Sequence, residues 1–288
     1  MHKNNLKIGI VFALCAIAIF SVMNAVIKGI ETTYPPLQVA FMRFLVSMIP
    51  CFGFYFYEKN RPALFISKKI TLKHLLRGIM GGIGIASLCA AFRLLPFGDA
   101  TAINFSSILF ITALSVPMLH QDVDRARWIA ILIGFIGILI IAQPGGNVFG
   151  MGAIYALIYA LMDAYVIVSG RLLSTQHSPG AATAVFCLFA TLTTGIGAFF
   201  VWKEILFFDL FILIGIGLLG GLGFLFQTIA YNFASASAVA PMAYSGMLWG
   251  GIFGFFIWGE IPSIFLVFGG ILIIGSGYYI ILRETKDL

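Results

Sequence analysis

Long apolar stretches separated by short polar breaks run through the whole chain. Most of them are close to the ~20 residues that an α-helix needs to cross the hydrocarbon core of a bilayer. The breaks predict ten membrane-spanning helices, over residues 8–28, 37–57, 75–95, 100–119, 128–143, 148–169, 181–202, 207–231, 238–258 and 263–282. The predicted fold class is therefore all-α integral membrane, with ten transmembrane helices.

The composition supports this interpretation. Of the 288 residues, 61% are hydrophobic and 10% are charged, and the mean hydropathy is +1.05. A soluble domain averages about 45–50% apolar and ~25% charged residues, so the chain has too little polar material to cover a globular surface. A collagen, a disordered tail and a large extramembrane domain are excluded as well. The four cysteines lie in apolar runs without a C-x-x-C pair, which is typical of small buried side chains.

The chain has a net charge of +6, and most of its basic residues fall on one predicted side of the membrane. With the N-terminus inside, thirteen of the 17 Lys and Arg lie on the inner side; Lys28, Arg93 and Lys203 lie outside, and Arg43 lies within a helix. The positive-inside rule then predicts cytoplasmic N- and C-termini and a multi-pass protein of the inner (plasma) membrane. The expected partners are the lipid bilayer and a small-molecule substrate, and no nucleic acid.

The chain also repeats itself weakly. A shift of 139 residues superimposes three well-separated segments: Met23–Ala25 on Met162–Ala164, Ala91–Phe92 on Ala230–Tyr231, and Phe105–Ser106 on Tyr244–Ser245. The predicted organisation is two five-helix repeats, residues 1–143 and 144–288, within one transmembrane domain. Because five is odd, the second repeat enters the membrane from the opposite side, and such inverted repeats serve alternating access in transporters.

Several motifs resemble a known family. They are Arg43 early in the second helix, Leu75-Leu-Arg-Gly78 at the start of the third, and Ala240-Pro-Met-Ala-Tyr-Ser-Gly-Met-Leu-Trp249 followed by Trp258-Gly-Glu-Ile-Pro262. Together with the ten helices they resemble the drug/metabolite transporter superfamily, EamA type, over essentially the whole chain. Ala160-Leu-Met-Asp163 is most similar to the S-adenosylmethionine uptake carriers. Leu119-His-Gln-Asp122 departs from the Gly-Glu that the family has after helix 4.

Two ionisable residues, Asp163 and Arg43, lie clearly inside predicted helices, where a charge costs at least ~2.5–3.5 kcal/mol. Each is about six residues from a helix end, Asp163 from the inner end and Arg43 from the outer end. We therefore expect no direct ion pair unless the helices tilt strongly. Asp163 is interpreted as a counter-ion for a cationic or zwitterionic substrate, as a proton carrier, or as a structural carboxylate. Arg43 either binds a substrate carboxylate, ties its helix to backbone carbonyls, or snorkels outward.

Neutral polar residues predict a polar-lined central cavity, although each stripe alone is also typical of bonds between helices. Tyr159 lies one turn before Asp163 and is expected to bond its carboxylate or to cage a cation. Aromatic side chains are candidate stacking walls for a planar substrate. The candidate substrate-binding residues are Asp163, Tyr159, Asn24, Arg43, Asn104, Gln227, Tyr231, Tyr244 and Trp249.

These features predict a secondary active transporter that moves a small organic metabolite, an amino acid or S-adenosylmethionine-like zwitterion, by alternating access. A proton-coupled exporter of cationic drugs or metabolites is the alternative. An intramembrane enzyme is remote, because Asp99 has no second membrane carboxylate at matching depth and the chain has no H-E-x-x-H or G-x-x-x-x-G-K-[ST] motif. We expect no enzymatic activity, no cofactor, no metal and no ATP hydrolysis.

Overall fold

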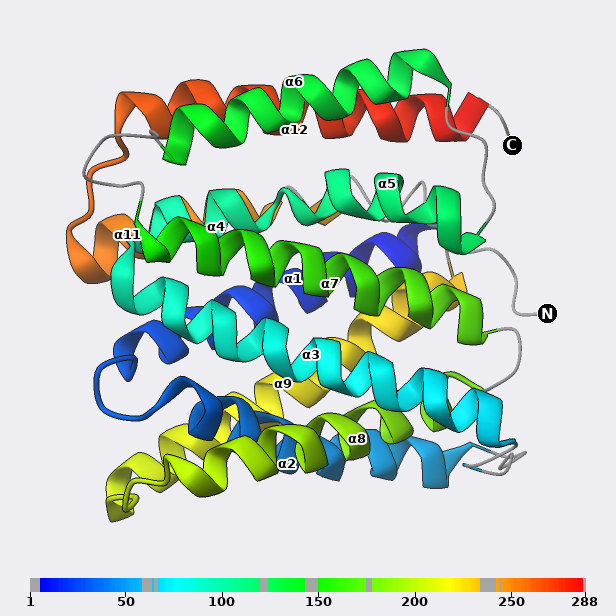
Figure 1. Cartoon of the computed structure of the whole chain (residues 1–288), viewed down its shortest axis with the longest axis vertical. Coiled ribbons are helices and arrows are strands. Elements are labelled where there is room, and N and C mark those ends of the chain that lie inside the picture. Colours follow the sequence, from blue (N-terminus) through cyan, green and yellow to red (C-terminus); the bar gives the residue numbers. More distant parts are fainter. Residues whose placement is uncertain are drawn as a thin grey trace.

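The computed structural model describes residues 6–58, 64, 67–119, 124–142, 150–174, 178–233, 242–243 and 245–286. The regular secondary structure within these ranges is entirely helical (Figure 1). The helices are α1 (Leu6–Gly29), α2 (Pro36–Tyr57), α3 (Lys68–Leu94), α4 (Phe97–Asn104), α5 (Ser107–Leu119), α6 (Arg125–Ala142), α7 (Met151–Ser174), α8 (Pro179–Phe200), α9 (Phe207–Phe233), α11 (Ser245–Trp258) and α12 (Ile264–Lys286).

The helices have the length and apolarity of membrane spans. Among the described residues, seven segments are long and apolar enough to cross a membrane, with α4 and α5 counted as one of them. Three shorter apolar helices cover residues 128–141, 245–258 and 264–279. These segments correspond one to one with the ten predicted helices, so the predicted all-α membrane class is confirmed.

Helix α3 begins earlier than predicted. Residues 68–74, predicted to be part of a connection, form its first two turns because Ser67 caps the helix. The Ser67 Oγ accepts a hydrogen bond from the Ile70 N–H at 3.4 Å, and the Thr71 hydroxyl donates to the Ser67 carbonyl at 2.9 Å. A serine at this position satisfies one of the free N–H groups of a helix start. Arg77, predicted at the start of this helix, consequently lies well inside it.

The fourth predicted membrane segment is present, but its helix is not continuous. It divides into α4 and α5 at Phe105 and Ser106. The Ser106 N–H bonds to the carbonyl three residues back at 3.0 Å, and the Ile108 N–H does the same at 3.2 Å. These tighter bonds replace part of the α-helical ladder. Hydropathy cannot detect such a break, because both halves are equally apolar.

Helix α7 also differs from its prediction, with consequences for Asp163. It covers Met151–Ser174 instead of 148–169, so Asp163 lies twelve residues after its start and eleven before its end. The carboxylate is therefore at the middle of the helix and not six residues from an end. In the ninth predicted helix, residues 238–241 and 244 are outside the described residues.

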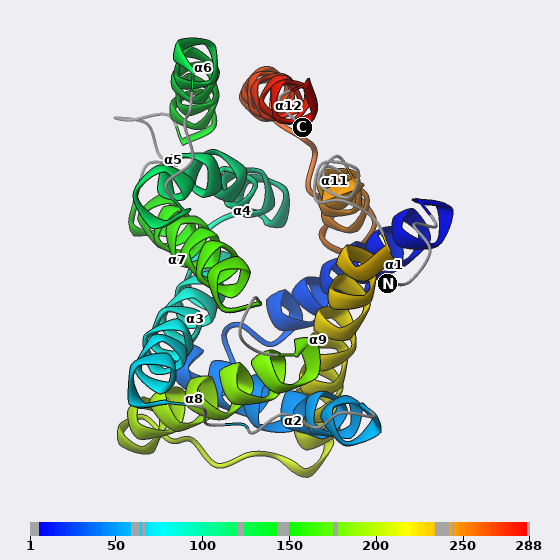
Figure 2. The ribbon, with the colours of Figure 1, turned by 90° about the vertical axis from the view of Figure 1, so that its right-hand side faces the viewer.

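The helices associate in a few dominant pairs. α1 packs on α9, α3 on α7, α2 on α8 and α6 on α12, and α2 and α3 also contact α9 and α8 respectively. Figures 1 and 2 show α6 and α12 as an outer layer at one side of the bundle. α4 packs on both α11 and α7, and α5 packs mainly on α7.

The two ends of the bundle differ in what they carry. The connections at residues 30–35, 95–96, 201–206 and 259–263 lie at one end, which we call the turn face (left in Figure 1). The start of α1 and the end of α12 both lie at the opposite end, which we call the terminal face. The bundle thus has both chain ends on one side.

Glycines allow the closest helix contacts. A Cβ added at Gly78 of α3 would lie 2.8 Å from the Ala190 nitrogen of α8, and one at Gly217 of α9 would lie 2.4 Å from the Val46 Cβ of α2. Small residues at such contacts are typical of membrane helix interfaces. The Ser47 hydroxyl also donates to the Gly217 carbonyl at 2.7 Å, so α2 is fixed against α9.

Candidate functional site

Arg43 is a buried cation with unused hydrogen-bond donors. Its side chain is 3% exposed and lies in a junction of α1, α2 and α9. The guanidinium carbon is 5.1 Å from the ring centre of Phe44 and 5.8 Å from that of Phe224. Among the residues described, Nε and Nη1 have no hydrogen-bond partner. The aromatic faces offset only part of the cost of burying this charge.

Gly220 makes room for the Arg43 head group. A Cβ at this position would lie 3.1 Å from the Arg43 Nε, 3.1 Å from the Ser47 Oγ and 3.4 Å from the Met23 Sδ. The guanidinium therefore lies directly against the backbone of α9, deep in the bundle. Neither snorkelling outward nor a tie to backbone carbonyls accounts for its unpartnered Nε and Nη1.

Asp163 receives a hydrogen bond that was not predicted. The donor is the hydroxyl of Ser107, the first residue of α5. This places the carboxylate beside a helix N-terminus, where negative charge is favoured. Nothing in the sequence distinguished Ser107 from the other hydroxyl residues of its apolar run. The break between α4 and α5, which also was not predicted, creates this environment.

Tyr159 lies near both charged groups. Its hydroxyl is within the electrostatic field of both Asp163 and Arg43, and these two side chains also act on each other. Its ring lies near Gly84 of α3, where an added Cβ would be 3.8 Å from the Tyr159 Cδ2. Three members of the predicted set, from α2 and α7, are thus brought into one neighbourhood.

Four further polar atoms are buried without a partner in the described part of the chain: Asn24 Oδ1, Asn104 Oδ1, Ser106 Oγ and Ser245 Oγ. Leaving such a group unpaired costs about 1–3 kcal/mol, and each instance in a folded protein calls for an explanation. The two asparagines were predicted as site residues, whereas the two serines were not. The serines mark the break between α4 and α5 and the start of α11.

The remaining predicted residues are less informative. Gln227 is partly buried on α9. Trp249 of α11 stacks on Phe253, with ring centres 5.6 Å apart, and not on another member of the set. Tyr231 lies in the last turns of α9, but its side chain is outside the described residues, and Tyr244 is outside them entirely.

Arg77 is a partly buried cation that was predicted to lie at the start of the third helix, among the inner-side basic residues. Its Nε donates to the Val166 carbonyl of α7 at 3.1 Å, and its Nη1 donates to the Ala182 carbonyl of α8 at 3.5 Å. The guanidinium carbon lies 4.6 Å from the ring centre of Phe186. Arg77 therefore joins three helices through bonds within the protein, and the expectation that Asp163 and Arg43 alone are charged within the helices was wrong.

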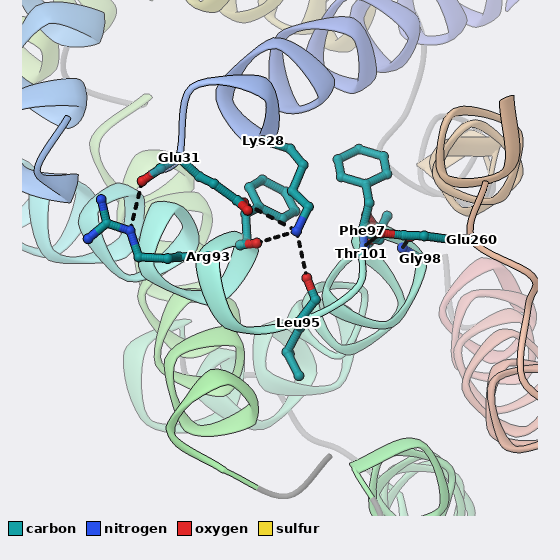
Figure 3. A network of polar contacts seen from close by, with 9 residues as sticks. Lys28, Glu31, Arg93, Leu95, Phe97, Gly98, Thr101 and Glu260 are labelled. Atoms are coloured by element: carbon teal, nitrogen blue, oxygen red, sulfur yellow. Dashed lines mark hydrogen bonds and ion pairs between the residues drawn. The ribbon is translucent and has the colours of Figure 1, made fainter. Parts of the chain in front are cut away.

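A polar network lies at the turn face (Figure 3). Lys28 donates to the Leu95 carbonyl at 2.9 Å and pairs with Glu31 at 3.2 Å. Burial raises the pKa of the Glu31 carboxyl, although the charge of Lys28 opposes the shift. Arg93 donates to the Glu31 carbonyl at 2.7 Å, and Lys203 donates to a carbonyl of the α1–α2 turn at 2.8 Å. The three basic residues predicted for the outer side thus lie at one face.

Membrane-length helices that enclose buried, unpartnered polar groups are typical of membrane transport proteins for small solutes. The EamA-like transporter family matches residues 7–143 and again residues 150–282, so the chain belongs to this family.

Named relatives match over nearly the full length. The pseudopaline exporter of Pseudomonas aeruginosa (strain UCBPP-PA14) is 27% identical, over 98% of this chain and 98% of the relative. The S-adenosylmethionine uptake transporter of Rickettsia prowazekii (strain Madrid E) is 26% identical, over 97% of this chain and 94% of the relative. A solved crystal structure with 15% identity has a TM-score of 0.68 and covers 97% of this chain and 98% of its own, which supports the fold.

Proposed function

We propose that the protein is a secondary active transporter of the inner membrane, with cytoplasmic termini, that moves a small zwitterionic metabolite by alternating access. An amino acid or an S-adenosylmethionine-like compound fits this description. Membership of the EamA-like family supports the transport function, and the Rickettsia relatives support this type of solute.

The observation that carries the proposal is that Nε and Nη1 of the buried Arg43 have no hydrogen-bond partner among the described residues. In this proposal its free N–H groups bind the substrate carboxylate by charge-assisted hydrogen bonds, which are the strong ones. Asp163 then serves as the counter-ion of the substrate amine, with the Tyr159 ring beside it. The site has one acidic and one basic side chain, so it suits a solute that carries both a positive and a negative charge.

Three observations support two inverted repeats divided near residue 143. The family matches the chain twice, once in each proposed repeat. A two-fold relation between the repeats would exchange α1 with α7 and α3 with α9. The packing of α1 on α9 and of α7 on α3 are then equivalent contacts, and both are present. The interface glycines also correspond at the 139-residue shift: Gly78, Gly81 and Gly82 to Gly217, Gly220 and Gly221.

Flux into proteoliposomes tests the proposal. We expect saturable flux of a labelled amino acid or of S-adenosylmethionine, and much weaker flux of analogues without the carboxylate. Both directions are measured, because the relatives include an exporter and uptake carriers. Asp163→Asn is expected to lower the flux strongly, whereas Glu204→Gln, at an exposed carboxylate of the turn face, leaves it unchanged.

Absence of saturable flux for all these solutes in both directions would refute the proposal. A flux that requires an imposed proton gradient and accepts cations without a carboxylate would instead favour a proton-coupled exporter. An unchanged rate in Asp163→Asn would remove this residue from the mechanism.

A further inference from the structure

Glu260 makes an unusual bridge at the turn face (Figure 3). Its Oε1 accepts the Phe97 N–H at 2.9 Å, and its Oε2 accepts the Gly98 N–H at 3.2 Å. These N–H groups belong to the first turn of α4, where the helix dipole favours a negative charge. One carboxylate therefore satisfies two free donors of a helix from another part of the chain.

The backbone around Glu260 is shaped for this contact. Gly259 adopts a φ of 65°, a conformation that glycine tolerates best. The Glu260 N–H then bonds back to the Gly254 carbonyl at 2.9 Å, and the chain turns the carboxylate toward α4. The ring of Trp258 also packs on Phe97, with ring centres 5.1 Å apart. The end of α11 is thus fixed on the start of α4.

The bridge joins segments that separate farther down the bundle. Gly250 of α11 faces Thr101 of α4, and Gly246 faces Phe105, so the two helices run together from the turn face to the break. Helix α4 also contacts α7, and beyond the break α5 packs mainly on α7. The end-on view in Figure 2 shows α5 over α7 with α11 on the other side of the bundle. The contact of this segment with α11 is therefore made toward the turn face.

The contact between α2 and α8, which belong to different halves of the chain, is held by hydrogen bonds at both ends of the bundle. At the turn face, the Gln38 side chain exchanges two hydrogen bonds with the Lys203 backbone, at 2.7 and 3.0 Å. At the terminal face, Glu58 accepts hydrogen bonds from the Ser178 hydroxyl at 2.6 Å and from the Gly180 N–H at 2.9 Å. α2 and α8 are thus tied at both ends, which makes them a scaffold and leaves α4 and α11 as the elements that can separate.

We propose that Glu260 is the latch that keeps the turn face closed, and that its release from the start of α4 opens the central site toward that face. This inference rests on the alternating access of the proposed function. The carboxylate is also close enough to Asp99 and Glu31 to feel their charges.

Accessibility of a native thiol tests the latch without any substrate. Cys89 of α3 is 3% exposed and lies in the electrostatic field of Arg43 and Tyr159, so it reports on the central site. Protein in proteoliposomes is treated with a membrane-impermeant maleimide from either side, and labelled Cys89 is identified by peptide mass. The cysteine of a Glu204→Cys variant, at the exposed turn-face loop, reacts with reagent added from the turn face. Its labelling therefore identifies the side to which the reagent was added.

Glu260→Gln is expected to raise the labelling rate of Cys89 from the turn face by about tenfold or more, since one of the two hydrogen bonds is lost and the other is no longer charge-assisted. Labelling from the terminal face is expected to fall or stay unchanged. Glu260→Asp, which keeps the charge on a shorter side chain, is expected to give an intermediate rate, and Glu204→Gln is expected to match the native protein.

The latch is refuted if neither Glu260 variant changes the labelling of Cys89 from the turn face. It is also refuted if labelling rises equally from both sides with a lowered Tm, because this outcome indicates general loosening. Failure of the proposed transport function appears separately, as a lack of flux in the native protein, and does not alter the labelling comparison.

Discussion

Arg43 and Arg77 lie in similar helix junctions, but Arg43 is buried whereas Arg77 is partly buried, and their hydrogen bonding differs. Arg43 lies where α1, α2 and α9 meet, and Arg77 lies where α3, α7 and α8 meet. Both stack on phenylalanine rings. Arg77 donates to two backbone carbonyls, whereas the Nε and Nη1 of Arg43 have no partner in the described residues.

This difference separates a structural charge from a functional one. A buried charge destabilises the fold unless hydrogen bonds compensate it. Arg77 is compensated within the protein, so its main effect is to hold three helices together. Arg43 is compensated only in part, so we infer that its compensation comes from the substrate.

Replacing Arg43 gives the largest expected effect. Arg43→Met removes two or more charge-assisted bonds of about 1.5–3 kcal/mol each, so saturable flux should fall by about 100-fold or more. The Tm of the empty protein should stay the same or rise, because an unpartnered buried charge is removed. Flux in proteoliposomes and thermal unfolding are measured on the same preparation. Normal flux, or a marked loss of Tm, would contradict the functional assignment.

Replacing Arg77 should give the opposite pattern. Arg77→Met breaks the bonds to Val166 and Ala182 and loses the contact with Phe186, at a cost of about 2 kcal/mol of stability. The Tm should fall, while the KM of the folded fraction changes by less than about threefold. A large rise in KM without a loss of Tm would place Arg77 in the substrate site.

The equivalent glycines at the two junctions sharpen the comparison further. In Gly81→Ala the new Cβ would lie 2.7 Å from the Phe186 ring, which should destabilise the protein by about 1–3 kcal/mol. In Gly220→Ala it would lie 3.1 Å from the Arg43 Nε, which should displace the guanidinium and raise KM severalfold with a smaller loss of Tm. The two substitutions are compared by Tm and by KM; equal effects on both measures would argue against distinct roles.

The smallest expected effect concerns Ser107. Ser107→Ala removes one hydrogen bond to the Asp163 carboxylate, worth about 1 kcal/mol. We expect a rise in KM of about fivefold for solutes with an amine, and little change for amine-free analogues. Ser115→Ala on the same helix, whose hydroxyl bonds a local carbonyl at 2.7 Å, is the matched control. An identical KM change for both classes of solute would indicate that Ser107 acts only through the helix.

The sequence predicts the membrane segments and part of the candidate site. The apolar runs predicted every membrane segment, and the rarity of charges directed attention to Arg43 and Asp163. Arg77 was missed because a serine cap extends α3 beyond its apolar part. Ser107 and the break before it were missed because a change from i−4 to i−3 hydrogen bonds leaves hydropathy unaltered. Whether a buried charge has a partner depends on tertiary contacts, which no local pattern contains.

The most direct test of the central claim is ligand-induced thermal stabilisation of the purified protein, since a ligand that binds the folded state raises its Tm. A carboxylate-bearing solute found by the flux assay is compared with its methyl ester, in the native protein, Arg43→Met and Arg77→Met. The account predicts that the free acid raises the Tm of the native protein and of Arg77→Met, that it does not stabilise Arg43→Met, and that the ester stabilises none of them. Equal stabilisation of Arg43→Met and the native protein by the free acid would contradict the account.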